Sequence, residues 1–165
     1  MDWYTFLIIT HIIGTVLGAG GATFAEVFYL KAKRDGVIEP LEVDYLKTSY
    51  LILRIGLFIL IISGFGFLLL YRLAGYGEGL LNPKLWAKLT IVAILIINAF
   101  LIQIRKIPMW LGASVSLTSW YGALILGAWR TLETPFISIM IVYVVAVFVM
   151  AGILELIRKY LKIPV

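Results

Sequence analysis

Five long apolar blocks, separated by short polar segments, constrain the fold of this 165-residue chain more than any other feature. The blocks cover residues 3–30, 48–71, 85–104, 110–130 and 136–157. A helix needs roughly 20 apolar residues to cross the hydrocarbon core of a bilayer. Helices also satisfy all of their backbone polar groups internally, as a membrane span must. The sequence therefore predicts an all-α integral membrane bundle of five transmembrane helices, with residues 1–165 forming a single domain.

The composition agrees with a membrane protein and argues against a soluble one. Hydrophobic residues make up 62% of the chain and charged residues 14%, whereas ordinary globular proteins have about 25% charged residues. The net charge of +5 does not indicate binding to nucleic acid, because the basic residues lie at the ends of the apolar blocks. There is no cysteine, which excludes disulfides and thiolate metal sites. We expect the lipid bilayer, and no nucleic acid, as a partner.

The basic residues also predict the orientation in the membrane. With five spans, one side of the membrane receives nine basic residues: Lys31, Lys33, Arg34, Lys47, Arg105, Lys106, Arg158, Lys159 and Lys162. The other side receives three: Arg72, Lys84 and Arg130. Because cytoplasmic segments carry the excess of lysine and arginine, we expect the N-terminus outside and the C-terminus inside a prokaryotic inner membrane. The fourth block is rich in serine and threonine, and a re-entrant segment there is the alternative. It would leave four spans and place the basic C-terminus outside.

Four ionisable residues lie within the predicted spans, where such groups are costly and are candidates for function. A rise of about 1.5 Å per residue places His11 and Lys88 in the outer half and Glu26 and Arg54 in the inner half. We expect Glu26 and Arg54 to form a structural ion pair between consecutive helices, with ligand or proton handling as the alternative. Lys88 either extends to the outer headgroups or holds an anionic group such as a propionate.

His11 is the one histidine in the chain and allows two interpretations. It is either a neutral residue bonded to a neighbouring helix or an axial ligand to haem iron. Gly14 and Gly18 follow on or near the same helix face. Such small residues leave room for a macrocycle, or they allow close helix packing, including packing against a second copy of the chain.

Three segments resemble a group of small bacterial membrane proteins. The segment THIIGTVLGAGGATFAEVFYLKA at residues 10–32 is similar to the first helix of the HemJ-type protoporphyrinogen oxidases and of the membrane domain of the CopD copper-resistance family. LRIGLFILIISGFGFLLL at 53–70 resembles their second helix, and LWAKLTIVAILIINAF at 85–100 resembles their lysine-bearing third helix.

The resemblance implies a helical bundle in which His11 matches the haem-ligating histidine of the HemJ-type members and Lys88 matches the lysine of the third helix. The chain differs in having no further histidine, and Asn98 stands where the third helix might end in one. A haem would then need a weak second ligand, an open position, or His11 of another subunit.

Three classes of function follow from these observations. The first is a b-type haem protein for electron transfer or porphyrin-related redox chemistry, with His11 as the metal ligand, Gly14 and Gly18 beside it, and Lys88 or Arg130 near the propionates. The second is transport of a small solute, a proton or a metal ion. The third is a structural or assembly subunit of a membrane complex. The sequence leaves open whether the protein is an enzyme.

Overall fold

The computed structural model describes residues 2–34, 36–75, 80–129, 131–161 and 163. Within these residues the chain forms five long helices and no strand, which confirms the predicted all-α fold. The helices are α1 (Trp3–Ala32), α2 (Pro40–Leu73), α3 (Pro83–Gln103), α4 (Met109–Ala128) and α5 (Phe136–Tyr160). Each of the five is long and apolar enough to cross a membrane. The fourth block is thus one continuous helix of 20 residues.

Local sequence explains where the helices begin. The Asp2 carboxylate accepts a hydrogen bond from the backbone N–H of Thr5 and caps α1. Hydrogen bonding with Thr5 also lowers the pKa of Asp2 below its usual value. α2 begins at Pro40, eight residues before the start of the predicted span at residue 48. Pro40 occupies the first turn, where its missing N–H costs nothing, and Glu39 with Glu42 forms a capping box before it.

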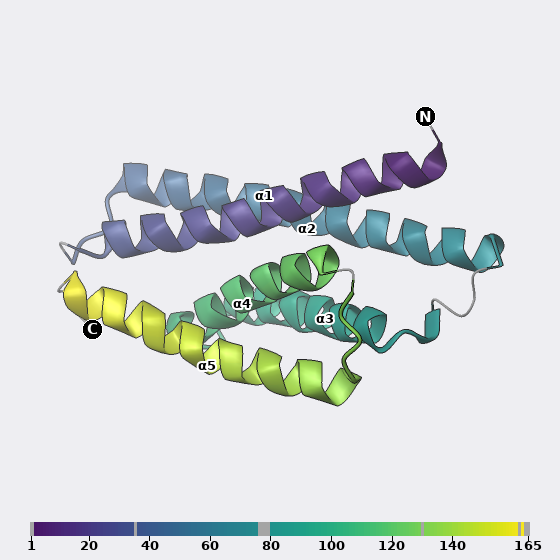
Figure 1. The fold of residues 1–165 in the computed structure, drawn as a ribbon. Helices are drawn as coiled ribbons and strands as arrows, with labels where there is room; N and C mark the ends of the chain where they lie inside the picture. Colours follow the sequence, from purple (N-terminus) through teal and green to yellow (C-terminus); the bar gives the residue numbers. More distant parts are fainter. Residues whose placement is uncertain (1, 35, 76–79, 130, 162, 164–165) are drawn as a thin grey trace.

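The helices run alternately in opposite directions along the long axis of the molecule (Figure 1), so the chain traverses its length five times. The C-terminal end of α5, the α1–α2 connection and the α3–α4 connection lie together at the left in this view, and the N-terminus lies at the right. The segments with the most basic residues therefore share one end. This is the arrangement that the charge asymmetry requires.

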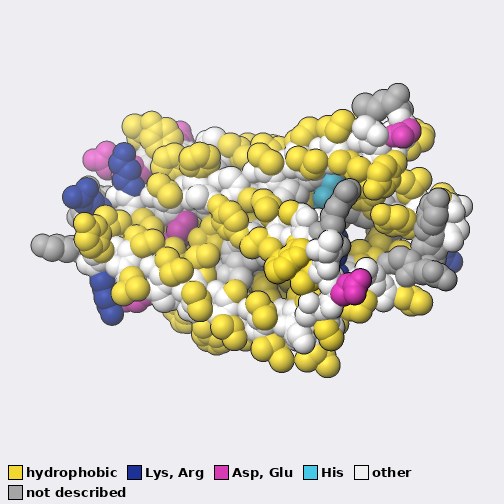
Figure 2. Space-filling model, in the orientation of Figure 1, with side chains coloured by type: hydrophobic (Ala, Val, Ile, Leu, Met, Phe, Trp, Pro, Cys, Tyr) yellow, Lys and Arg dark blue, Asp and Glu magenta, His cyan; other side chains and the backbone are white. Residues whose placement is uncertain are grey.

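The surface along the helices is apolar (Figure 2), whereas charged side chains gather at the ends of the molecule. Large hydrophobic side chains are exposed on every helix, for example Val16 at 61%, Phe58 at 65% and Phe148 at 67%. Contiguous apolar surface of this extent is typical of a protein that lies in lipid. The fold is that of a multi-pass membrane protein.

Two helices form a close pair and three form a second group (Figure 1). α1 packs along α2, α4 contacts α3 and α5, and α4 also contacts α1 and so joins the two groups. Glycines bring α1 and α2 together. A Cβ atom at Gly56 of α2 would lie 2.4 Å from the backbone nitrogen of Gly18 and 2.8 Å from the carbonyl oxygen of Gly14. The backbones touch here because none of the three residues has a side chain.

One tryptophan connects the α1–α2 pair to α4. Trp120 is fully buried, and its indole ring lies directly over Gly18. It belongs to a core cluster with Ala19 and Ala22 of α1 and Leu53 and Leu60 of α2. A second cluster, where α3, α4 and α5 meet, contains Ala87, Ile91, Leu126, Ile139, Tyr143 and Val147.

Candidate functional site

His11 lies half-buried on α1 and is bonded to α2. Its Nδ1 atom lies 2.9 Å from the hydroxyl oxygen of Ser63, a residue with no exposed surface. The same hydroxyl lies 2.7 Å from the carbonyl oxygen of Ile59. A hydroxyl has one hydrogen to donate. Because the carbonyl can only accept, Ser63 donates to Ile59 and accepts from the Nδ1–H of His11.

This arrangement fixes the tautomer of the imidazole. With the proton on Nδ1, the Nε2 atom carries a lone pair. Phe67 of α2 packs edge-to-face on the ring, with centroids 5.6 Å apart, and further restricts its orientation. The contacts show His11 bonded to a neighbouring helix, as the first interpretation expects. Within the described residues Nε2 forms no hydrogen bond, so the second interpretation stays a prediction.

Lys88 of α3 is the second member of the candidate site. It is half-buried, and its ammonium group is within electrostatic range of Lys84 and of His11. Within the residues that the structure describes, its ammonium forms no hydrogen bond or ion pair. The charge of Lys88 is within electrostatic range of His11, although α1 packs on α2 and α4 rather than along α3. Arg130, the other residue expected near the propionates, lies outside the described residues.

The two glycines of α1 do not leave space for a flat ligand. A Cβ at Gly14 would lie 2.8 Å from the backbone nitrogen of Leu60, and one at Gly18 would lie 2.0 Å from the indole of Trp120. Protein atoms fill both positions, so the close-packing interpretation holds for them. These contacts use Gly14 and Gly18 for packing within the chain.

Glu26 forms an ion pair, but the prediction that its partner is Arg54 was wrong. Arg158, in the last turn of α5, donates to the Glu26 carboxylate at 3.2 Å. The exposed fractions of these two side chains are 18% for Arg158 and 9% for Glu26. Arg54 is exposed on α2 and forms no ion pair within the described residues. The pair therefore joins α1 to α5 rather than α1 to α2.

Hydroxyl and amide groups link the remaining helices. Tyr121 of α4 bonds to Thr23 of α1 at 2.9 Å, and Tyr143 of α5 bonds to Ser119 of α4 at 2.8 Å. The Asn98 side chain donates to the carbonyl oxygen of Gly112 at 2.9 Å. Asn98 thus ties α3 to α4.

Sequence reasoning missed Ser63 as the partner of His11 and Arg158 as the partner of Glu26. A signal for each was present. Ser63 lies in the outer half of the second span, at a depth similar to that of His11, and Arg158 lies at the same membrane end as Glu26. Depth alone did not select these partners, because it says nothing about which helices are neighbours.

Comparison with protein-family models, curated proteins and solved structures found no significant match to the chain. The functional argument therefore rests on the geometry of His11, Ser63 and Lys88 and on the chemistry that these groups allow.

Proposed function

We propose that this protein binds haem b in a prokaryotic inner membrane, with its N-terminus outside and with His11 as an axial ligand. The observation that carries the proposal is the His11 imidazole, which is bonded to Ser63 through Nδ1, while its Nε2 atom forms no hydrogen bond within the described residues. The ammonium of Lys88 is within electrostatic range of the imidazole.

The geometry of His11 is the one that metal-binding histidines use. Such a residue almost always donates its other ring N–H to an oxygen acceptor, which fixes the tautomer and orients the ring. Ser63 supplies that acceptor from the neighbouring helix. A neutral imidazole in this state is a suitable axial ligand for haem iron.

Lys88 supplies the complementary charge. Haem b carries two propionates, and a carboxylate in the outer half of a membrane is stabilised by a charge-assisted hydrogen bond from an ammonium group. A positive charge without a partner is costly in this environment, so an anionic ligand also relieves the cost of placing Lys88 there.

Bound haem would supply one-electron redox chemistry, for electron transfer or for reactions of porphyrins. The chain has a single histidine, so bis-histidine ligation within one chain is excluded. The sixth position is then open, weakly ligated, or filled by His11 of a second copy.

A haem titration of the detergent-purified protein, followed by its absorption spectrum, tests this proposal. We expect His11→Ala to lose the Soret band of the complex, and added imidazole to restore it by replacing the missing ligand. Lys88→Met should weaken haem binding by about tenfold, which corresponds to the loss of one hydrogen bond to a charged group. Lys47→Met removes the same charge from an exposed site in the first turns of α2 and serves as the control. Equal haem binding by wild-type protein and His11→Ala would overturn the proposal.

A further inference from the structure

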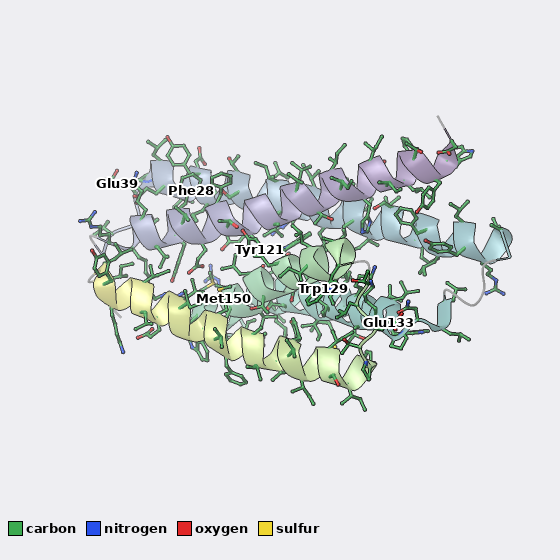
Figure 3. All side chains as sticks on the ribbon, viewed as in Figure 1. Phe28, Glu39, Tyr121, Trp129, Glu133 and Met150 are labelled. Atoms are coloured by element: carbon green, nitrogen blue, oxygen red, sulfur yellow. The ribbon has the colours of Figure 1, made fainter. Side chains whose placement is uncertain are left out.

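An elongated cavity of about 520 Å³ lies between α4 and α5, apart from His11. Tyr121 and Trp129 border it from the α4 side and Met150 from α5 (Figure 3), and Ile91 of α3 forms part of its floor. Its lining residues on α5 extend from Ser138 to Ile153, a length of about 22 Å along the helix. The volume is in the range of small-molecule binding sites, roughly 300–1,000 Å³.

The cavity opens toward the apolar outer surface, and the lining that the structure describes is uncharged. Several lining side chains are exposed on the membrane-facing surface, among them Val142, Val149 and Ile125. None of the described residues that line it is charged. A molecule that enters from the bilayer therefore reaches it without crossing water, and an ionised molecule would find no partner inside.

One buried hydroxyl lines this cavity without a hydrogen-bond partner. Thr118 of α4 is 6% exposed, and its Oγ1 atom has no partner among the described residues. Most buried polar side-chain atoms have one, because an unsatisfied group costs about 1–3 kcal/mol. Thr118 lies near the middle of α4, so the unpaired hydroxyl lies at the apolar depth of the membrane. It marks a position where a ligand oxygen would be stabilised.

We propose that this cavity binds an uncharged, lipid-soluble quinone whose ring carbonyl accepts a hydrogen bond from Thr118. Tyr121, Trp129 and Tyr143 add aromatic surface to the lining, which favours a flat ring over a plain hydrocarbon chain. The length of the cavity accommodates an isoprenoid tail. The acyl chain of a phospholipid fills the same volume but offers no acceptor at the depth of Thr118. This site is independent of haem binding at His11.

The test is a titration of the purified protein with decylubiquinone, followed by quenching of tryptophan fluorescence. Gly122 lines the cavity and has open space around its Cβ position, so Gly122→Leu fills the site without clashing with the protein. Gly127 also has open space, lies on the same helix and is not among the lining residues. Gly127→Leu is therefore the matched control. Thr118→Val removes the hydroxyl while retaining the shape of the side chain.

We expect saturable binding in the wild type and in Gly127→Leu, five- to tenfold weaker binding in Thr118→Val, and none in Gly122→Leu. If Gly122→Leu melts abnormally, Ala146→Leu fills the same cavity from α5. Quenching that does not saturate in the wild type would overturn the proposal. So would equal affinity in the wild type and Thr118→Val, since the cavity would then be a groove for lipid acyl chains.

Discussion

Adding a single methyl group at Gly18 tests the packing of the bundle most sharply. A Cβ atom there would lie 2.0, 2.2 and 2.4 Å from three carbon atoms of the Trp120 ring, whereas ordinary contacts begin at 3.4 Å. The ring cannot move toward solvent, because Trp120 is fully buried between helices. Overpacking typically costs 1–3 kcal/mol and occasionally more. We expect Gly18→Ala to lower the free energy of unfolding by about 3 kcal/mol.

Gly20 provides a matched control two residues away on the same helix. No atom lies within 4 Å of its Cβ position, so Gly20→Ala should be neutral or slightly stabilising, since alanine favours helix. Unfolding of the purified protein by increasing sodium dodecyl sulfate, followed by circular dichroism, measures both changes. In a Trp120→Leu background, Gly18→Ala should reduce the free energy of unfolding much less, because the indole atoms that the new methyl group would meet are absent. Equal costs at Gly18 and Gly20, or an unchanged cost without the indole, would refute the reasoning.

Two further predictions concern side-chain partners. Ser63→Ala should weaken haem binding by about tenfold in the spectroscopic titration, because His11 loses the acceptor that orients its ring; unchanged affinity would show that Ser63 has no such role. Arg158→Met should destabilise the protein by about 3 kcal/mol, since it leaves the Glu26 carboxylate buried and unpaired. Arg54→Met should change stability by less than about 0.5 kcal/mol in the same unfolding assay, and the reverse ranking would favour a Glu26–Arg54 pair after all.

Much of the fold was predictable because hydropathy and length determine which segments can span a bilayer. The five spans agree with the observed helices to within a few residues, except at the start of α2. There the polar residues 40–47 extend the helix beyond its apolar part. Hydropathy does not detect this polar extension, which Pro40 starts in the first turn, where proline favours helix.

The sequence allowed us to predict how deep each candidate residue lies along its helix, but not which residues of other helices it contacts. Counting residues placed His11 and Lys88 at one depth and Glu26 at the other end of α1, where the structure pairs Glu26 with Arg158 in the last turn of α5. The identity of contacting helices depends on packing, which glycines and Trp120 determine here. That is why Arg158 rather than Arg54 meets Glu26, and why Gly18 receives an indole ring. No sequence motif or periodic pattern indicates either of these two contacts.

The absorption spectrum of the protein as isolated in detergent, oxidised and then reduced with dithionite, tests the central claim most directly. Haem ligated by His11 predicts a Soret band in the wild type that shifts on reduction and is absent from His11→Ala. A wild-type protein that is colourless when purified from haem-replete cells, and stays colourless after haem is added, would contradict the account. His11 would then be a packing residue bonded to Ser63, and transport or assembly would be the functions to test.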